Sequence, residues 1–257
     1  MKNLSKGNIW QIYGRVQISI QIIFWIITIY ICNFNLIFEC FENSITQFIL
    51  LFIFVYNQIC ALRNFYLGVQ TSSEVISKLK EEKEQNNLIR TTLCKKCGIE
   101  RPLRSHHCSI CNICIERMDH HCYFLNNCIG KKNYKYFFSY LFFGMINSLG
   151  SIILGCYRFY LSKYYKSRKI NNATELKEFL SLSTNIILLL LICIPTFLGC
   201  IYLLIYHLFL IYKGQTTIER VYPKLYIKEE MNEKMPFYEK FRNLMESDNL
   251  FNIFLIE

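Results

Sequence analysis

One stretch decides how this chain folds: CKKCGIERPLRSHHCSICNICIERMDHHCYFLNNCIGKKNYKYF, residues 94–137. It holds seven of the thirteen cysteines and four of the five histidines in 257 residues. The cysteines are spaced as Cys94-x2-Cys97 and Cys108-x2-Cys111-x2-Cys114, and the run Asp119-His120-His121-Cys122 and Cys128 follow. So many thiols in so short a stretch are held either by disulfides or by metal ions.

The spacing favours zinc over disulfides. A Cys-x2-Cys pair places two thiolates on one tetrahedral ion, and imidazole nitrogens complete the shell. The stretch also has too few apolar residues to fold alone, so bound metal would supply the folding free energy. The charge distribution given below places this loop on the reducing side of a membrane, where disulfides do not persist. The histidines argue against an iron–sulfur cluster.

Counting ligands singles out one thiol. Two closed tetrahedral sites need eight ligands, and the stretch offers seven cysteines and four histidines, so at least one cysteine can be free. Cys122 directly follows Asp119, His120 and His121. A histidine that is oriented by a carboxylate generates a reactive thiolate, which makes Cys122 a candidate nucleophile. Spacing alone leaves open a purely structural zinc module in which Cys122 is another ligand.

The rest of the chain has the composition of a membrane protein. Apolar residues make up 53% of the sequence and collect in long blocks. We predict membrane spans at 18–38, 45–67, 136–161 and 183–212, because each is long enough to cross about 30 Å of hydrocarbon. The expected fold is an all-α polytopic membrane protein with four transmembrane helices and a cysteine-rich domain that binds two zinc ions. The six cysteines within or near the apolar blocks are expected to act as small hydrophobes.

The lysines and arginines set the orientation. They number three in residues 1–17, none in 39–44, twelve in 68–135, five in 162–182 and seven from 213 onward. The positive-inside rule therefore places the tails 1–17 and 213–257 and the loop 68–135 in the cytosol, and the loop 162–182 in the lumen. The five charges of that last loop run against the rule. Because basic residues beside spans explain the net charge of +10, no nucleic-acid partner is expected.

Two further segments have amphipathic character. Residues 71–90 are charged with spaced apolar positions, which predicts a short helix leading into the cysteine cluster. Near the end of the chain, six apolar residues are spaced to form one helical face that packs against the cluster or lies on the membrane: Phe237, Phe241, Leu244, Met245, Phe251 and Phe254. No internal repeat stands out.

The stretch resembles the cysteine-rich domain of DHHC-type protein S-acyltransferases, or palmitoyltransferases. Their pattern, C-x2-C-x9-H-C-x2-C-x2-C-x4-D-H-H-C-x5-C-x4-N-x3-F, is matched at every element up to Asn133 and Phe137. Four spans with this loop between the second and third are the family's architecture, and residues 216–219 are similar to its TTxE element. The sequence departs from the family at Tyr123, where a proline is usual, and lacks the Asp-Pro-Gly element after the second span.

The resemblance implies a ligand set and a catalytic set. One zinc ion would be held by Cys94, Cys97, His107 and Cys114. The second would be held by Cys108, Cys111, His121 and Cys128. Cys122 would then be the nucleophile, His120 the general base and Asp119 the residue that orients His120. Thr217 of the TTxE-like element would reach Asp119.

The resemblance also implies a reaction. Cys122 would take a fatty acyl group, such as palmitate, from acyl-CoA and pass it to accessible cysteines of proteins at the cytosolic face of the Golgi or ER membrane. Basic residues near the site are candidates to bind the CoA phosphates, although attraction to lipid headgroups explains each of them equally well: Arg101, Arg104, Lys131, Lys132 and Lys135. A catalytically inactive zinc-binding membrane adaptor is the alternative function.

Overall fold

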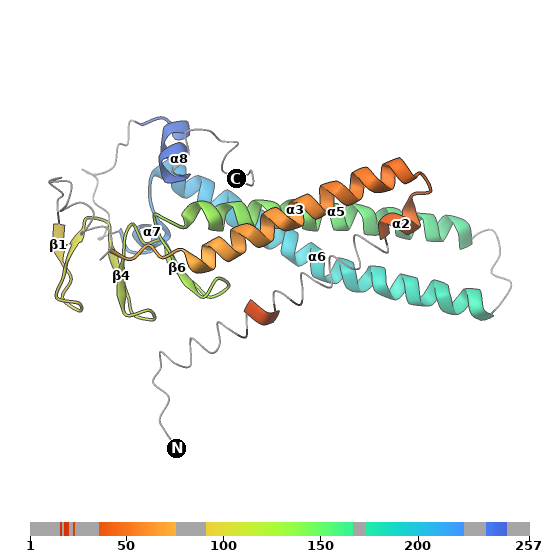
Figure 1. Cartoon of the computed structure of the whole chain (residues 1–257), viewed down its shortest axis with the longest axis horizontal. Coiled ribbons are helices and arrows are strands. Elements are labelled where there is room, and N and C mark those ends of the chain that lie inside the picture. The colour runs from red at the N-terminus through yellow and green to blue at the C-terminus, as the bar shows by residue number, and fades with distance from the viewer. Residues whose placement is uncertain are drawn as a thin grey trace, which may run out of the picture. The chain divides into compact units, whose positions relative to one another are not determined.

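The computed structural model describes residues 16, 18–20, 23, 36–75, 91–166, 173–223 and 235–245 (Figure 1). The chain divides into two compact units. The first comprises residues 1–20, 63–139 and 205–257, and the second comprises 21–62 and 140–204. The cysteine-rich stretch lies in the first unit, and most of the apolar helical residues lie in the second.

Three long helices carry the apolar blocks: α3 (Ser44–Gln70), α5 (Tyr134–Lys166) and α6 (Ala173–Lys213). Their segments Ser44–Gln70, Tyr134–Leu161 and Ile186–Lys213 are long and apolar enough to cross a membrane. The spans predicted at 45–67, 136–161 and 183–212 are thus confirmed as membrane-length helices. Many of their large apolar side chains are exposed, as expected for contact with lipid.

The described residues contain three such helices instead of the four predicted. The predicted first span, 18–38, lies mostly outside the described residues. Within it, residues 18–20 and 23 are helical, and the short helix α2 (Ile37–Cys40) begins where it was expected to end. The predicted loop at 162–182 is largely helical, because α5 continues to Lys166 and α6 begins at Ala173.

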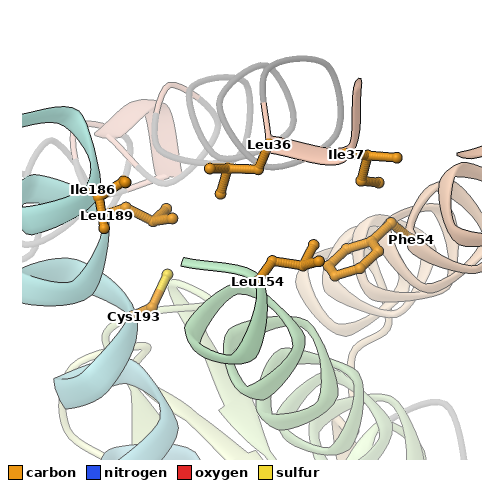
Figure 2. Packing of buried hydrophobic residues seen from close by; sticks show 7 residues of the cluster. All are labelled: Leu36, Ile37, Phe54, Leu154, Ile186, Leu189 and Cys193. Atoms are coloured by element: carbon orange, nitrogen blue, oxygen red, sulfur yellow. The ribbon is translucent and has the colours of Figure 1, made fainter. Parts of the chain in front are cut away.

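Apolar side chains from α2, α3, α5 and α6 form the core of the second unit. Its cluster of buried residues is drawn in Figure 2: Leu36, Ile37, Phe54, Leu154, Ile186, Leu189 and Cys193. Gly150 lets the ring of Phe54 approach α5, since a Cβ atom there would lie 2.7 Å from Phe54 Cζ. Cys193 packs in this cluster as a small hydrophobe, as predicted.

The cysteine-rich stretch is built of β-hairpins, so the prediction of an all-α protein is wrong here. Strand β1 (Thr91–Leu93) pairs with β2 (Glu100–Pro102), β3 (His106–Cys108) with β4 (Ile113–Ile115), and β5 (His120–Cys122) with β6 (Asn127–Ile129), all antiparallel. The physical reason lies in the ligands. A hairpin turn and a cross-strand pair each bring two side chains to one point, and this polar stretch has no 3.6-residue apolar period to favour a helix.

The three hairpins repeat every 14 residues, a regularity that the sequence reading missed. The pairs Leu93↔Glu100, His107↔Cys114 and His121↔Cys128 occupy the same register position in successive hairpins. The turn residues with positive φ, Gly98 (68°), Asn112 (59°) and Asn126 (47°), follow the same interval. Glycine and asparagine tolerate this left-handed conformation at the least cost.

The third hairpin is bound to the end of α3. Asn127 Nδ2 donates to the backbone carbonyls of Gly68, Val69 and Thr71 at 2.9, 3.2 and 2.9 Å, which satisfies acceptors left over at the helix terminus. Beyond α3, Thr71–Ser73 are not helical and Glu74 forms an isolated β-bridge with Ile115. The amphipathic helix predicted at 71–90 is therefore wrong for these first residues, and positions 76–90 lie outside the described residues.

Two short helices follow α6. Helix α7 (Thr217–Val221) begins with a capping box in which Thr216 and Glu219 satisfy each other's backbone N–H groups. Helix α8 (Phe237–Met245) buries Phe241, Leu244 and Met245, and the Phe241 ring lies 5.5 Å from that of Phe138 in α5. The predicted apolar face is confirmed for these three residues. Phe237, predicted to share that face, is exposed, and Phe251 and Phe254 lie outside the described residues.

Candidate active site and metal centres

The first metal cluster joins two hairpins. Cys94 and Cys97 come from the β1–β2 turn, and His107 and Cys114 are the cross-strand pair of β3–β4. Their ligand atoms all lie within 4.8 Å of one another. His107 Nδ1 is 3.0 Å from Cys97 Sγ, 3.9 Å from Cys94 Sγ and 4.0 Å from Cys114 Sγ.

The second cluster repeats this arrangement one hairpin further on. Cys108 is the last residue of β3 and Cys111 lies in the β3–β4 turn, while His121 and Cys128 are the cross-strand pair of β5–β6. His121 Nδ1 lies 3.8 Å from Cys108 Sγ, 3.4 Å from Cys111 Sγ and 3.5 Å from Cys128 Sγ. The two clusters therefore interlock, because the middle hairpin gives its cross-strand pair to one and its turn to the other.

The geometry of both clusters fits tetrahedral zinc. Zinc bonds of ~2.3 Å to sulfur and ~2.0 Å to nitrogen place neighbouring ligand atoms roughly 3.5–3.8 Å apart. The Cys97–Cys114 and Cys111–Cys128 sulfur pairs, at 3.7 and 3.5 Å, match this spacing. Three cysteines and one histidine in each cluster are also a donor set that zinc prefers. Two zinc ions fit the chain.

The thiols need a cation to ionise together. A backbone hydrogen bond from Cys97 lowers the pKa of Cys94 to about 7, whereas burial and then the nearby Cys94 and Cys97 raise the pKa of Cys114 to about 12. In the second cluster, the Cys108 thiol raises the pKa of Cys111 to about 11. Neighbouring thiolates repel one another, so a bound divalent ion is what allows all three thiols of a cluster to be ligands.

The repeat explains why Cys122 stands outside both clusters. Cys94, Cys108 and Cys122 are each 14 residues apart and begin the turns of the three hairpins. In the first two turns the second ligand is Cys97 or Cys111, but in the third turn this position is Leu125. The chain then enters α5, so no fourth hairpin follows to supply a cross-strand pair. Cys122 thus occupies the position of a zinc ligand for which the other three ligands are missing.

Asp119 and His120 complete the surroundings of Cys122. His120 Nδ1 lies 2.7 Å from Asp119 Oδ2, and the His120 imidazole also forms a hydrogen bond with Cys122. Burial disfavours the charged imidazole, but hydrogen bonds with Asp119 and Cys122 outweigh it and raise the pKa of His120 to about 10. For Asp119, burial likewise opposes ionisation, yet the hydrogen bond with His120 and the backbone of Thr217 keep its pKa below the usual value. The acid, base and thiol form one connected group.

Helix α7, which is distant from Asp119 in the sequence, binds its carboxylate. The Thr217 backbone N–H donates to Asp119 Oδ1 at 2.9 Å, and the Thr217 hydroxyl donates to Oδ2 at 2.7 Å. The expectation that Thr217 reaches Asp119 is confirmed. The Asp119 side chain is only 1% exposed, so these bonds replace the water that it would otherwise bind.

A buried ion pair fastens α7 to the hairpins. Arg104 donates from Nε and Nη2 to the two carboxylate oxygens of Glu219 at 2.7 and 2.6 Å, and Nη2 also donates to the Gly214 carbonyl at 2.9 Å. Glu219 Oε2 in turn accepts from the Thr216 N–H at 2.9 Å. This bidentate pair positions the helix that carries Thr217.

Comparison with known proteins agrees with this geometry. A model of the DHHC palmitoyltransferase family matches residues 87–224, more than half of the chain. The chain belongs to the DHHC palmitoyltransferase family. No curated protein matched the chain in a sequence comparison. The matched range runs from just before the first hairpin to just after α7, so it includes both clusters, Cys122 and the TTxE-like element of this family member.

The basic residues predicted to bind CoA phosphates differ in their surroundings. The Arg104 guanidinium is taken up by Glu219 and Gly214, so its place in the fold is structural. Lys131 Nζ lies 3.6 Å from Glu116 Oε1, and the Lys132 backbone N–H donates to Ser73 Oγ. Arg101, in β2, is half-buried and its Nε has no hydrogen-bond partner in the part of the chain that the structure describes. Phosphate binding by these residues stays a prediction.

The amino-acid sequence alone did not identify a group of aromatic and imidazole rings that packs beside His120. Phe137 of α5 and His207 of α6 contact its imidazole, and His207 Nδ1 lies 2.8 Å from the hydroxyl of Tyr134, also in α5. The signal was present in the sequence, because a histidine in an apolar membrane segment is costly without a partner. What the sequence did not show is which residue that partner is.

Proposed function

We propose that this chain is a protein S-acyltransferase that moves a fatty acyl group from acyl-CoA to cysteines of other proteins. The observation that carries the proposal is the connected group of Asp119, His120 and Cys122, in which the one thiol of the third turn has a histidine partner instead of a metal. Membership in the DHHC palmitoyltransferase family supports it.

In the first step the Cys122 thiolate attacks the carbonyl carbon of the acyl-CoA thioester. A new carbon–sulfur bond forms to Cys122, the bond to the CoA sulfur breaks, and the proton that His120 holds goes to the departing CoA thiolate. Asp119 orients the imidazole through Nδ1, which leaves the second ring nitrogen available for proton transfer.

In the second step a cysteine thiol of a protein substrate gives its proton to His120 and attacks the acyl-enzyme. The acyl group passes to the substrate sulfur, and its bond to Cys122 breaks. Cys122 is released as a thiolate, which restores the starting state. Each step exchanges one thioester for another, so the barrier is lowered chiefly by thiolate formation, proton transfer and orientation.

When bound, the zinc ions would supply folding energy. They take no part in the bonds that form and break during acyl transfer. The residues that would hold them are Cys94, Cys97, His107 and Cys114, and Cys108, Cys111, His121 and Cys128. They would fix β5, which carries His120 and Cys122, through the adjacent ligand His121.

The membrane helices suit an acyl donor with a long apolar chain. Their exposed apolar side chains face a hydrocarbon solvent in which such a chain is soluble. We propose that the hairpins and both tails are cytosolic, in the Golgi or ER membrane, where both acyl-CoA and protein substrates with accessible cysteines are met. Arg101, whose buried Nε has no hydrogen-bond partner among the described residues, is the basic residue that we assign to the CoA phosphates, since Arg104 and Lys131 face carboxylates.

Labelling of the purified protein tests the proposal. The wild-type chain in detergent is incubated with radiolabelled palmitoyl-CoA, and we expect label that hydroxylamine releases, as it does from a thioester. Cys122→Ala should lose the label. Cys156→Ala is the matched control, because Cys156 is an exposed thiol in α5, and it should keep the label. Equal labelling of wild type and Cys122→Ala would leave the inactive zinc-binding adaptor as the better function.

A further inference from the structure

The His120 imidazole is held by two rings in addition to Asp119. Its centroid lies 5.2 Å from that of Phe137 at 71° and 6.1 Å from that of His207 at 39°. Phe137 and His207 in turn contact each other at 5.0 Å and 75°. Each of the three rings thus contacts the other two.

His207 is itself fixed by a hydroxyl. Its Nδ1 lies 2.8 Å from the Tyr134 hydroxyl, and the two rings meet edge to face at 5.6 Å. The His207 residue is 2% exposed and Tyr134 is 4% exposed, so water does not compete for this bond. A buried imidazole without a hydrogen-bond partner is unfavourable, which makes this pairing a specific feature of the site.

Three helices therefore divide the support of Asp119 and His120. Thr217, the first residue of α7, binds the Asp119 carboxylate, whereas His207, within α6, contacts the His120 ring. Helix α5 supplies Tyr134 and Phe137. Asp119 fixes only the Nδ1 end of His120, so a second contact is needed to set the plane of the ring.

We propose that His207 is a positioning residue for acyl transfer, which sets the plane of the His120 ring through a contact that the Tyr134 hydroxyl maintains. His207 touches neither Cys122 nor the acyl donor in this role and acts only through His120. The inference rests on the proposed acyl transfer and adds a residue to it. A small error in ring orientation is costly, because proton transfer to sulfur depends on alignment.

Three variants separate positioning from packing. Tyr134→Phe removes the hydroxyl and keeps the ring. His207→Phe keeps a ring of similar size without nitrogen. His207→Asn keeps a polar atom near the position of Nδ1 but removes the ring. Tyr212→Phe is the matched control, because Tyr212 lies in the same helix with its side chain 60% exposed.

The measurement is the steady-state rate of Cys122 acylation against palmitoyl-CoA concentration, with zinc content as the test of folding. We expect Tyr134→Phe and His207→Phe to lower kcat by about ten- to a hundredfold with KM unchanged. The double variant should be no slower than the slower single one, because both changes break one chain of contacts. His207→Asn should not restore the rate, and Tyr212→Phe should match the wild type.

Several results would overturn the inference. Wild-type kcat in both Tyr134→Phe and His207→Phe would show that the rings only fill space. A raised KM with unchanged kcat would place His207 in donor binding instead. If the wild type itself takes no hydroxylamine-sensitive label, the proposed function fails, and the role of His207 falls with it. Loss of zinc in His207→Phe alone would leave Tyr134→Phe, which removes one atom, to decide the question.

Discussion

Thr217 grips the carboxylate of Asp119 at both oxygens, with its backbone nitrogen 2.9 Å from Oδ1 and its hydroxyl 2.7 Å from Oδ2. The two residues are 98 positions apart in the chain. Because Asp119 also holds His120, the first residue of a five-residue helix controls the orientation of the proposed base. The TTxE-like element is therefore part of the site in this chain, and its Ile218 packs against a buried cluster that includes Cys108 and Cys128.

Removing the Thr217 hydroxyl tests how much its hydrogen bond to Asp119 contributes. Thr217→Val keeps the shape of the side chain and the backbone bond but leaves Asp119 Oδ2 with His120 alone. A hydrogen bond to a charged group contributes about 1.5–3 kcal/mol, so the acylation rate should fall about ten- to a hundredfold. Thr217→Ser is the matched control and should keep most of the rate. Equal rates in Thr217→Val and the wild type would show that the backbone N–H is sufficient.

The Arg104–Glu219 pair is predicted to stabilise the fold. The Arg104 side chain is 12% exposed and that of Glu219 is 0% exposed, so Arg104→Met strands a buried carboxylate. The expected loss in the free energy of unfolding is about 3–5 kcal/mol, measured by denaturation in detergent. Glu219→Gln retains a side-chain acceptor for the Thr216 N–H. The double variant should lose clearly less than the sum of the two single variants, and strict additivity would argue against a direct interaction.

Zinc content distinguishes ligands from the nucleophile. Metal analysis of the purified wild type should find two zinc ions per chain, as the two clusters imply. Cys97→Ala should lower this number and destabilise the hairpins, because the metal supplies their folding energy. Cys122→Ala should keep both ions and lose only acylation. Loss of zinc from Cys122→Ala would make Cys122 a ligand, which is the alternative that spacing alone had left open.

Gly130 is predicted to tolerate no side chain. It joins β6 to α5, and a Cβ atom there would lie 2.6 Å from the Glu116 carbonyl oxygen, 2.7 Å from Ile115 Cγ2 and 2.8 Å from Ser73 Cβ. Gly130→Ala should therefore cost about 1–3 kcal/mol in the free energy of unfolding, as overpacked sites do. Gly199→Ala is the matched control in α6, where nothing lies within 4 Å, and it should be neutral or mildly stabilising. A neutral Gly130→Ala would mean that the α3–hairpin junction is looser than described.

The amino-acid sequence by itself determined the ligand types, the candidate nucleophile and three of the membrane helices. These features are local. Cys-x2-Cys brings two thiolates to one ion through a single turn, and a long apolar block needs lipid wherever it lies in the fold. The 14-residue interval of Cys94, Cys108 and Cys122 was equally present in the sequence, but the intervening residues differ, so only the strand register made it visible.

The tertiary structure alone decided which residues support Asp119 and His120, the proposed catalytic pair. Arg104 and Glu219 are 115 positions apart, and Tyr134 and His207 are 73 apart. No periodicity or spacing encodes such contacts, because they depend on which residues at the end of α6 and in α7 pack beside the hairpins. The same reason explains the strands. Whether a cysteine-rich stretch is helical or extended is set by the convergence of its ligands on the metal, and that convergence is a property of the folded chain.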